Sequence, residues 1–353
     1  MSSDAIGLGV IGMNPHNMGS TMTLVHDAPD LRYDLVAACA KHGDVLQAYA
    51  EREGIPFATT DYRELVARDD VDVVAVYSPD ALHAEHCIAA LEAGKHVVCT
   101  KPMVTSLDDA KALVDAVRTS GRLFLVGQTM RFDRQFATLR QMVEAGDLGE
   151  MMAAEAFYIH DLRPVYDFTP WRLTMPQDFM YGGVTHPVDI LRSFLGDVAE
   201  VHCYAARGKL TPDYPIKNLF YLNLKFASGV IGQVKGLYDV VEPPLPMMQV
   251  ALYGTGGTAV GEFTDNAPGV LRVVQDRLPV KNPLTMHFEP ERDTSVYGHG
   301  ATVVRYMRHF QECIDGKAKP SPDVVDGARA VAVAAAAWES AKSGKPAAVF
   351  NAF

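Results

Sequence analysis

The chain has 353 residues, more than one ordinary hydrophobic core accommodates, so two domains are expected. Hydrophobic residues make up 48% of it and charged residues 21%, which are the proportions of a globular protein. Acidic residues outnumber Lys and Arg by 43 to 32, and the net charge of -11 argues against nucleic acid or an anionic membrane as the main partner, because both bind basic surfaces.

Short apolar runs alternate with helical patterns through the first 128 residues. The runs are apolar at nearly every position, as in strands buried on both faces of a sheet. They cover residues 5–12, 33–40, 71–79, 95–100 and 122–128. Helices are predicted between them, over residues 19–27, 44–54, 81–94 and 106–121. This alternation predicts an α/β fold, with a Rossmann-type, doubly wound parallel sheet in a dinucleotide-binding domain over residues 1–128.

Beyond residue 128 the predicted strands become longer and two-sided. They follow a helix over residues 133–146 and cover 151–160, 198–206, 218–226, 229–238, 247–254 and 257–262. Two helices, over 300–315 and 323–343, close the chain, and residues 161–182 are expected to form a long loop rich in aromatic and charged side chains. Loops of that length are often functional. Residues 129–353 are therefore expected to form a second α/β domain with a mostly antiparallel sheet.

The five cysteines suggest a reducing environment. They are odd in number and widely spaced, and no C-x-x-C pair occurs, so free thiols are expected. The first residues lack the basic and apolar segments of a secretory signal, and no apolar run approaches the roughly 18 residues of a membrane helix. We therefore expect a cytoplasmic protein.

The loop after the first strand has the composition of a pyrophosphate site. The segment GLGVIGMNPHNMGSTM (7–22) leads from a strand into a helix, where glycines let the backbone approach phosphates and the helix N-terminus favours negative charge. The expected cofactor contacts are Gly12, Met13, Asn14 and Gly19. Asn14 stands where the second glycine of G-x-G-x-x-G would be, so a glycine-rich turn without a ligand is the alternative.

The end of the second strand bears on cofactor preference. An acid there would bind the ribose hydroxyls of NAD. This chain has Ala40, Lys41 and His42, and the first acid is Asp44. A nearby cation without a carboxylate favours a 2′-phosphate, so NADP is the expected cofactor. NAD is the alternative if Lys41 is simply a solvated loop residue.

A long motif resembles the Gfo/Idh/MocA oxidoreductases. VAVYSPDALHAEHCIAALEAGKHVVCTKPM (74–103) is similar to the family pattern in which a strand ends near S/T-P, a His follows, and GKHV leads to an E-K-P triplet. The resemblance continues through MRF (130–132), GDLGEM (146–151), TPWR (169–172), GGVTHPVD (182–189) and SGKP (343–346). It covers nearly the whole chain. It implies a dinucleotide-binding domain and an open-faced α/β domain.

The resemblance places the lysine of the triplet, Lys101, between nicotinamide and substrate, with Thr100 in the place of the glutamate. The carboxyl ends of parallel strands line the ligand crevice, which agrees with this position. Pro102 favours extended backbone angles at Lys101, so its side chain leaves the strand in a defined direction. A lysine there can stabilise charge that develops on the reacting oxygen.

His186 is the second expected catalytic residue. It precedes Pro187 at the start of a predicted helix, and an imidazole can transfer the hydroxyl proton as hydride leaves the carbon. The family often has an Asp four residues earlier, where this chain has Gly182. Either Lys101 and His186 suffice, or another acid such as Asp178 orients the imidazole. Asp189 matches a later acid of the pattern and is expected near the substrate.

The remaining expected contacts also follow from the resemblance. Ser78, Pro79 and His83 resemble the segment beside the cofactor, although His83 could equally be a helix-surface residue. Trp171 and Arg172 resemble the W-R pair near the nicotinamide, with a structural pairing of Arg172 to Asp178 as the alternative. The polar and aromatic stretch that precedes them supplies further substrate contacts, at Tyr158 and His160.

The implied activity is hydride transfer between NAD(P) and a secondary hydroxyl of a sugar or cyclic polyol. Two alternatives remain open: a glycosidase or sugar–sugar oxidoreductase that keeps its nicotinamide bound, and a non-catalytic cofactor-binding sensor. No metal site is expected, since the histidine pairs lack a third ligand at suitable spacing. Relatives in this family usually form dimers or tetramers, so a homo-oligomer that pairs the open sheets is expected.

Overall fold

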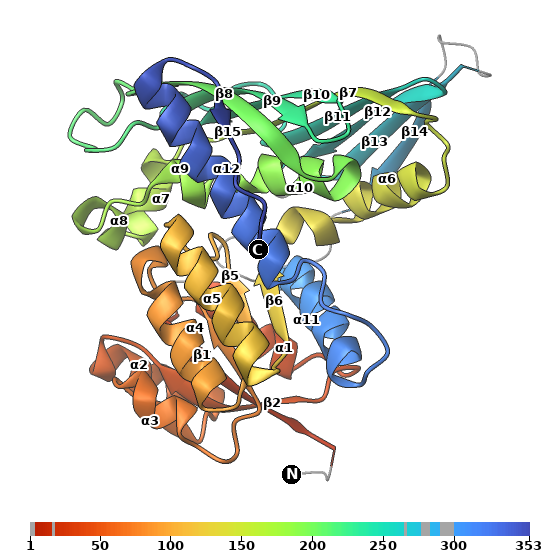
Figure 1. Cartoon of the computed structure of the whole chain (residues 1–353). Helices are drawn as coiled ribbons and strands as arrows, with labels where there is room; N and C mark the ends of the chain where they lie inside the picture. Colours follow the sequence, from red (N-terminus) through yellow and green to blue (C-terminus); the bar gives the residue numbers. More distant parts are fainter. Residues whose placement is uncertain (1–3, 16–17, 265–266, 277–282, 290–299) are drawn as a thin grey trace. The chain divides into compact units, whose positions relative to one another are not determined.

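The computed structural model describes residues 4–15, 18–264, 267–276, 283–289 and 300–353 (Figure 1). These residues form two compact units. The first contains the described residues up to 129 together with 300–328, and the second contains those from 130 to 289 together with 329–352. The first unit thus includes residues 300–328, which the sequence pattern placed in the second domain.

The first unit is built on a parallel sheet. Its strands are β1 (Ile6–Ile11), β2 (Tyr33–Cys39), β3 (Phe57–Thr59), β4 (Val73–Val76), β5 (His96–Thr100) and β6 (Phe124–Gly127). Their order is β3-β2-β1-β4-β5-β6, and every described pair is parallel. This order is that of the dinucleotide-binding fold, in which ligands bind beyond the carboxyl ends of the strands where the order reverses, here between β1 and β4. The predicted Rossmann fold is confirmed.

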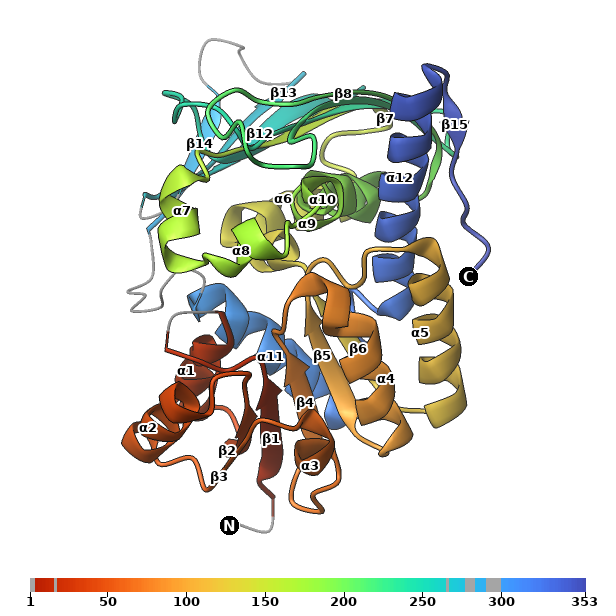
Figure 2. The same cartoon turned by 90° about the vertical axis from the view of Figure 1, so that its left-hand side faces the viewer.

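Helices cover both faces of this sheet. They are η1 (Met18–Thr21), α1 (Met22–His26), α2 (Gly43–Glu53), α3 (Tyr62–Val66), η2 (Asp80–Leu82), α4 (His83–Glu92), α5 (Leu107–Ser120) and α11 (Gly300–Ile314). Helices α4 and α5 lie on one face, and α1 and α11 on the other (Figure 2). The pattern missed β3 and α3, because three and five residues are too few to show a period.

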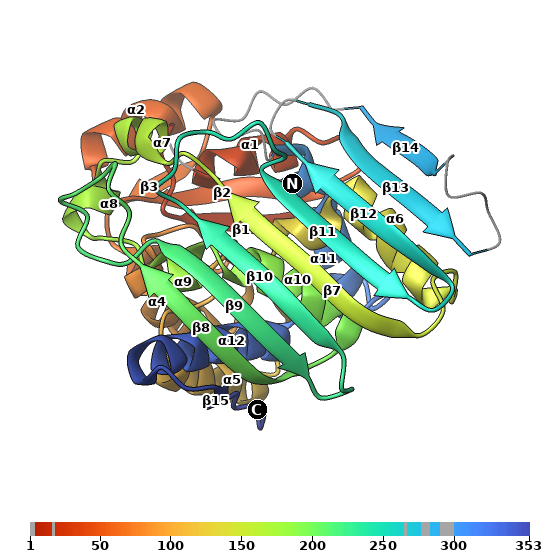
Figure 3. The ribbon, with the colours of Figure 1, turned by 90° about the horizontal axis from the view of Figure 1, so that it is seen from above.

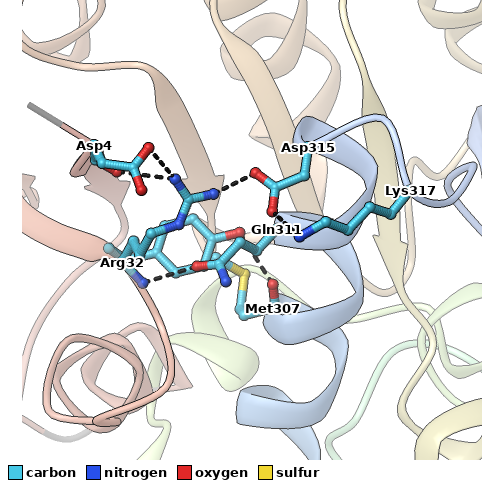
Figure 4. A network of polar contacts seen from close by, with 7 residues as sticks. Asp4, Arg32, Met307, Gln311, Asp315 and Lys317 are labelled. Atoms are coloured by element: carbon cyan, nitrogen blue, oxygen red, sulfur yellow. Dashed lines mark hydrogen bonds and ion pairs between the residues drawn. The ribbon is translucent and has the colours of Figure 1, made fainter.

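A polar network attaches α11 to the first unit (Figure 4). The backbone N–H of Arg32 donates to Oε1 of Gln311 at 2.8 Å, and its guanidinium forms ion pairs with Asp4 and Asp315. The buried hydroxyl of Tyr33 donates to the carbonyl of Met307 at 3.0 Å. A helix about 280 residues away in sequence is thereby fixed beside the start of β2.

The second unit is built on a larger, mostly antiparallel sheet. Its strands are β7 (Met151–Ile159), β8 (Val198–Ala206), β9 (Leu219–Phe226), β10 (Ile231–Leu237), β11 (Met248–Gly254), β12 (Gly257–Phe263), β13 (Gly269–Gln275), β14 (Leu284–Phe288) and β15 (Ala347–Ala348). Their order is β14-β13-β12-β11-β7-β10-β9-β8-β15, and β7 and β10 pair in parallel. The second half of the fold prediction is confirmed, although β13, β14 and β15 were not predicted.

Helices cover one face of this sheet, and none of the described helices lies on the other (Figure 3). Helices of the unit are η3 (Thr129–Phe132), α6 (Arg134–Glu144), α7 (Arg163–Phe168), α8 (Trp171–Thr174), α9 (Phe179–Gly182), α10 (Thr185–Leu195) and the part of α12 (Val324–Ser343) from residue 329. Figure 3 shows the uncovered face. In β9 the buried Phe220, Leu222 and Leu224 alternate with exposed residues such as Tyr221, as expected of a sheet with one solvent-exposed face.

The expected loop over 161–182 is wrong in one respect, because it contains α7, α8 and α9. Helices of four to six residues do not repeat an apolar period, so the pattern could not reveal them. Within the described part of the chain, no helix is long and apolar enough to span a membrane. The five cysteines are free and buried.

Candidate functional site

The loop after β1 is pressed against the end of β4. Gly12 has φ +90°, and a Cβ added there would lie 2.5 Å from backbone atoms of Tyr77 and Ser78. Its N–H and that of Met13 donate to the carbonyl of Cys39, at 2.8 and 3.0 Å. Only glycine fits this position, and the loop therefore stays close to the backbone at the point where strand order reverses. Such a cradle fits the pyrophosphate of a dinucleotide.

The other expected contacts of this loop follow it directly. Asn14 is half-buried, and Gly19 is buried within η1, where the chain turns into α1. At the end of β2, the N–H of Ala40 donates to the carbonyl of Thr59 at 3.3 Å. Lys41 and His42 follow as exposed residues at the start of α2. The carboxyl end of β2 thus carries one exposed cation and no carboxylate before Asp44.

The segments after β4 and β5 lie at the same edge of the sheet. Ser78 and Pro79 follow β4, and Thr100 ends β5, directly before Lys101. Lys101 is half-buried, and the Lys101–Pro102 peptide is cis. The Oγ of Ser78 lies 2.8 Å from Nδ1 of His86, which is in the first turn of α4. Lys101 therefore leaves the strand at the edge where the fold binds its ligands.

His83 does not have the exposed position that direct cofactor contact requires. Its ring is completely buried, with Nδ1 2.7 Å from the carbonyl oxygen of Pro102 and Nε2 2.7 Å from that of Ser78. Both ring nitrogens are thus used within the protein. Neither the expected cofactor contact nor the alternative helix-surface role describes this residue.

In the second unit, an aromatic group surrounds His186. This residue is the second of α10 and is 3% exposed, and its ring meets that of Tyr158 edge-on at 5.7 Å. Tyr158 also stacks with His160 at 6.1 Å and meets Tyr238 edge-on at 5.2 Å. Three residues expected at the substrate, which the chain separates by up to 28 positions, are therefore neighbours in the fold.

Tyr238 belongs to this group and was not predicted from the sequence. It is buried, and its ring lies so close to Gly183 that a Cβ there would be 2.3 Å from it. The glycine pair that opens the GGVTHPVD motif (182–189) was the available signal, because a glycine often marks a position that another group approaches closely.

Asp189 has a different role from the one expected. Its two carboxylate oxygens accept from Nε and a terminal nitrogen of Arg131, each at 2.7 Å, and both side chains are almost fully buried. The carboxylate is used in a bidentate ion pair between η3 and α10, so we assign it a structural role in place of substrate contact. Arg131 lies in the MRF motif (130–132), but nothing local to that motif indicates its partner.

Asp178, the acid considered for orienting His186, makes two other contacts. Asp178 caps α9, where Oδ1 accepts from the N–H of Met180 at 2.9 Å, and Oδ2 accepts from Nε1 of Trp338 at 2.8 Å. Beside Gly182, the side-chain amide of Gln177 fills the space in which a Cβ would lie, at 2.7 Å. A buried amide thus stands where the family pattern has a carboxylate.

The remaining expected residues lie in α8. Arg172 donates to Oγ1 of Thr169 at 3.0 Å, and Thr169 in turn donates to the carbonyl of Val165. This contact joins Arg172 in α8 to Thr169, the residue that follows α7. Trp171 begins α8, and its side chain lies outside the described residues. Among the described residues, His, Cys, Asp and Glu form no group of three that could hold a metal ion.

Two family models match the two units. The model described as "Oxidoreductase family, NAD-binding Rossmann fold" matches residues 6–128, and the Gfo/Idh/MocA C-terminal domain matches residues 136–260. This chain belongs to the Gfo/Idh/MocA oxidoreductase family. Its first unit is the NAD-binding domain, which agrees with the cradle at Gly12.

Curated relatives are similar over most of their length. The chain is 29% identical over 310 residues to 1,5-anhydro-D-fructose reductase of Ensifer adhaerens, covering 85% of this chain and 86% of the relative. It is 26% identical over 322 residues to scyllo-inositol 2-dehydrogenase (NAD(+)) of Bacillus subtilis strain 168, covering 86% of each. The structure of levoglucosan dehydrogenase in complex with NADH has a TM-score of 0.86 at 22% identity, covering 98% of this chain and 100% of that one, and so shows the same fold.

Proposed function

We propose that this enzyme transfers a hydride between a nicotinamide cofactor and a secondary hydroxyl, or the corresponding ketone, of a sugar or cyclic polyol. The observation that carries the proposal is the position of Lys101 at the carboxyl edge of β5, in the same sheet edge as the cradle at Gly12. The two relatives are named for activities on an anhydrosugar and an inositol, which supports this substrate class.

Each residue has a chemical role in this proposal. The bound nicotinamide supplies a hydride acceptor or donor. In the oxidation direction, Lys101 donates a hydrogen bond to the substrate oxygen and stabilises its developing negative charge. His186 accepts the hydroxyl proton, for which an imidazole with an ordinary pKa near 6.5 is suited. The carbon loses a hydride and the oxygen loses a proton, so the alcohol becomes a ketone. Tyr158 and His160 contact the sugar.

We propose NADP as the preferred nucleotide. The support is local: Ala40 offers no carboxylate to ribose hydroxyls, whereas Lys41 and His42 are exposed at the end of β2. A 2′-phosphate carries negative charge that a lysine attracts.

Three measurements test these proposals. Dialysed protein is titrated with NADPH and with NADH while nucleotide fluorescence is followed, and tighter binding of NADPH is expected. Sugars and cyclic polyols are then screened with the preferred nucleotide. Lys101→Ala should lose at least about a hundredfold in kcat, the effect of removing one oxyanion donor. Near-normal turnover by Lys101→Ala contradicts the mechanism, and nucleotide that survives dialysis favours the alternative with a permanently bound cofactor.

We also propose a homo-oligomer in the cytoplasm, paired through the open face of the second sheet. Tyr204 and Tyr221 are exposed and lie directly opposite each other on β8 and β9, and Ile231 on β10 is 62% exposed. Sedimentation of Tyr221→Glu should show a smaller species than the natural protein. An unchanged sedimentation coefficient contradicts the assignment of this face.

A further inference from the structure

A buried histidine joins two segments that carry expected site residues. His83 begins α4, and its ring lies between the carbonyl of Ser78, five residues earlier, and that of Pro102, nineteen residues later. Pro102 directly follows Lys101. The ring thus bridges the chain after β4 and the chain after β5, at the edge of the sheet that binds ligands in this fold.

The two contacts determine the protonation of the ring. A carbonyl oxygen can only accept a hydrogen bond, so each nitrogen must donate to make its 2.7 Å contact. A neutral imidazole has one N–H, and it would leave a lone pair facing a carbonyl oxygen. Only the imidazolium satisfies both contacts. Such charge-assisted hydrogen bonds are stronger than neutral ones, and each is shielded from water because His83 is 0% exposed.

The surroundings of the ring agree with a cation. Burial lowers the pKa of His83, whereas the carboxylate of Asp80 on η2 and the hydrogen bond to the Pro102 carbonyl raise it. Burial also raises the pKa of Cys99 on β5 well above its ordinary range, so that thiol is uncharged beside the ring. His86, one turn along α4, has the opposite behaviour, since burial lowers its pKa to about 4 and the charge on His83 contributes. The pair therefore divides into one charged and one neutral ring.

We propose that His83 is a doubly protonated cross-link that fixes the Lys101–Pro102 segment against the end of β4, and is thereby a positioning residue for Lys101. The inference rests on the proposed function for the role of Lys101, but the cross-link itself does not. Because Lys101 must reach the substrate oxygen with hydrogen-bond geometry, a small displacement of its backbone lowers turnover. Displacements of about 1 Å can cost roughly a hundredfold in rate.

The protonation is tested first in the natural protein. With ¹⁵N-labelled histidine, the His83 signals should show a proton on both ring nitrogens at pH 8, where an ordinary histidine is neutral. His86 should be neutral in the same spectrum. Signals are assigned by their loss in His83→Gln, or by transfer from the backbone if that variant does not fold. A His83 ring with one unprotonated nitrogen at pH 8 overturns the cross-link.

The positioning role is tested by a double-mutant cycle with saturating substrates. His83→Gln keeps one donor nitrogen in place of two and should lower kcat by about 10- to 100-fold in the natural background. In Lys101→Ala it should lower the remaining rate by less than about threefold, because the residue to be positioned is absent. A merely structural role lowers both rates equally, and this result overturns the proposal, as does an unchanged kcat in the natural background.

His96→Gln is the matched control. His96 is the first residue of β5, at the amino end of the strand and away from Lys101. Its Nδ1 accepts the N–H of Leu123 at 3.0 Å. Its substitution also removes a histidine hydrogen bond to the backbone but leaves Lys101 in place, so kcat should stay within about twofold while thermal stability falls. If Lys101→Ala itself retains natural turnover, the proposed function fails, whereas the NMR result on His83 is read independently.

Discussion

The buried ion pair between Arg131 and Asp189 leads to a quantitative prediction about stability. Asp189→Asn keeps the shape of the side chain but removes its charge, so the Arg131 guanidinium, whose side chain is 5% exposed, loses its carboxylate. Breaking a buried pair from one side typically costs about 3 to 5 kcal/mol, because the remaining charge stays buried and loses the carboxylate that balanced it. Asn still accepts one hydrogen bond, so we expect a loss of about 3 kcal/mol in the free energy of unfolding.

The chain offers a convenient assay for this loss. Both of its tryptophans, Trp171 and Trp338, belong to the second unit, which also contains the ion pair. Tryptophan fluorescence therefore reports the unfolding of that unit, by urea or by heat. Urea unfolding gives the change in free energy, and in heat unfolding the thermal midpoint should fall by roughly 6 to 12 °C for a unit of this size. Replacing both partners, as Arg131→Met with Asp189→Leu, should recover much of the loss, because neither charge of the pair is then left buried alone.

The control is an exposed pair in the same unit. Arg140 and Glu144 are 2.9 Å apart on α6, and Glu144 is 62% exposed in its side chain. Glu144→Gln should therefore cost less than about 0.5 kcal/mol. If Asp189→Asn unfolds no more easily than Glu144→Gln, the reasoning from burial is refuted.

Three further predictions concern the first unit. Gly12→Ala should weaken nucleotide binding more than tenfold in a fluorescence titration, because the new Cβ lies 2.5 Å from backbone atoms, whereas Gly54→Ala, also at positive φ but in open space, should leave binding unchanged. Ala40→Asp should shift the preference toward NADH, measured as the ratio of dissociation constants; an unchanged ratio contradicts the role of this strand end. Burial lowers the folded-state pKa of His86 to about 4, below its unfolded value of about 6.5, so its contribution is present above pH 6.5 and lost as pH falls toward 4. The free energy of unfolding, measured in urea at pH 4.5 and at pH 7, should therefore change less between the two pH values in His86→Gln than in the natural protein. The upper limit of this difference is about 3 kcal/mol.

Much of the first unit could be predicted because its signals are local. Strands such as β4 and β5 are apolar at successive positions, Ser106 caps α5 by accepting the N–H of Asp109 at 3.0 Å, and Gly121 ends that helix at φ +65°. Lys101 and Pro102 stand at a strand end by chain order alone. These properties depend on neighbours within a few residues, so the sequence determined them.

The tertiary structure decided which distant groups meet. His83 reaches Pro102 across nineteen residues, and Arg131 pairs with Asp189 across 58. Periodicity cannot reveal such partners, because it reports one face of one element and not the element opposite. The same reason explains why α11 joined the first unit through Arg32, although chain order favoured the second.

The sequence by itself therefore determined the family, the parallel sheet and the place of Lys101 and His186 on their elements. Only the tertiary structure decided that Asp178 accepts a hydrogen bond from Trp338 and that Asp189 forms an ion pair with Arg131. It also decided that His83 is buried. A carboxylate or imidazole has the same side chain in a ligand site or in a buried ion pair. Its role depends on the charges and hydrogen-bond partners that folding brings to it, and those come from distant parts of the chain.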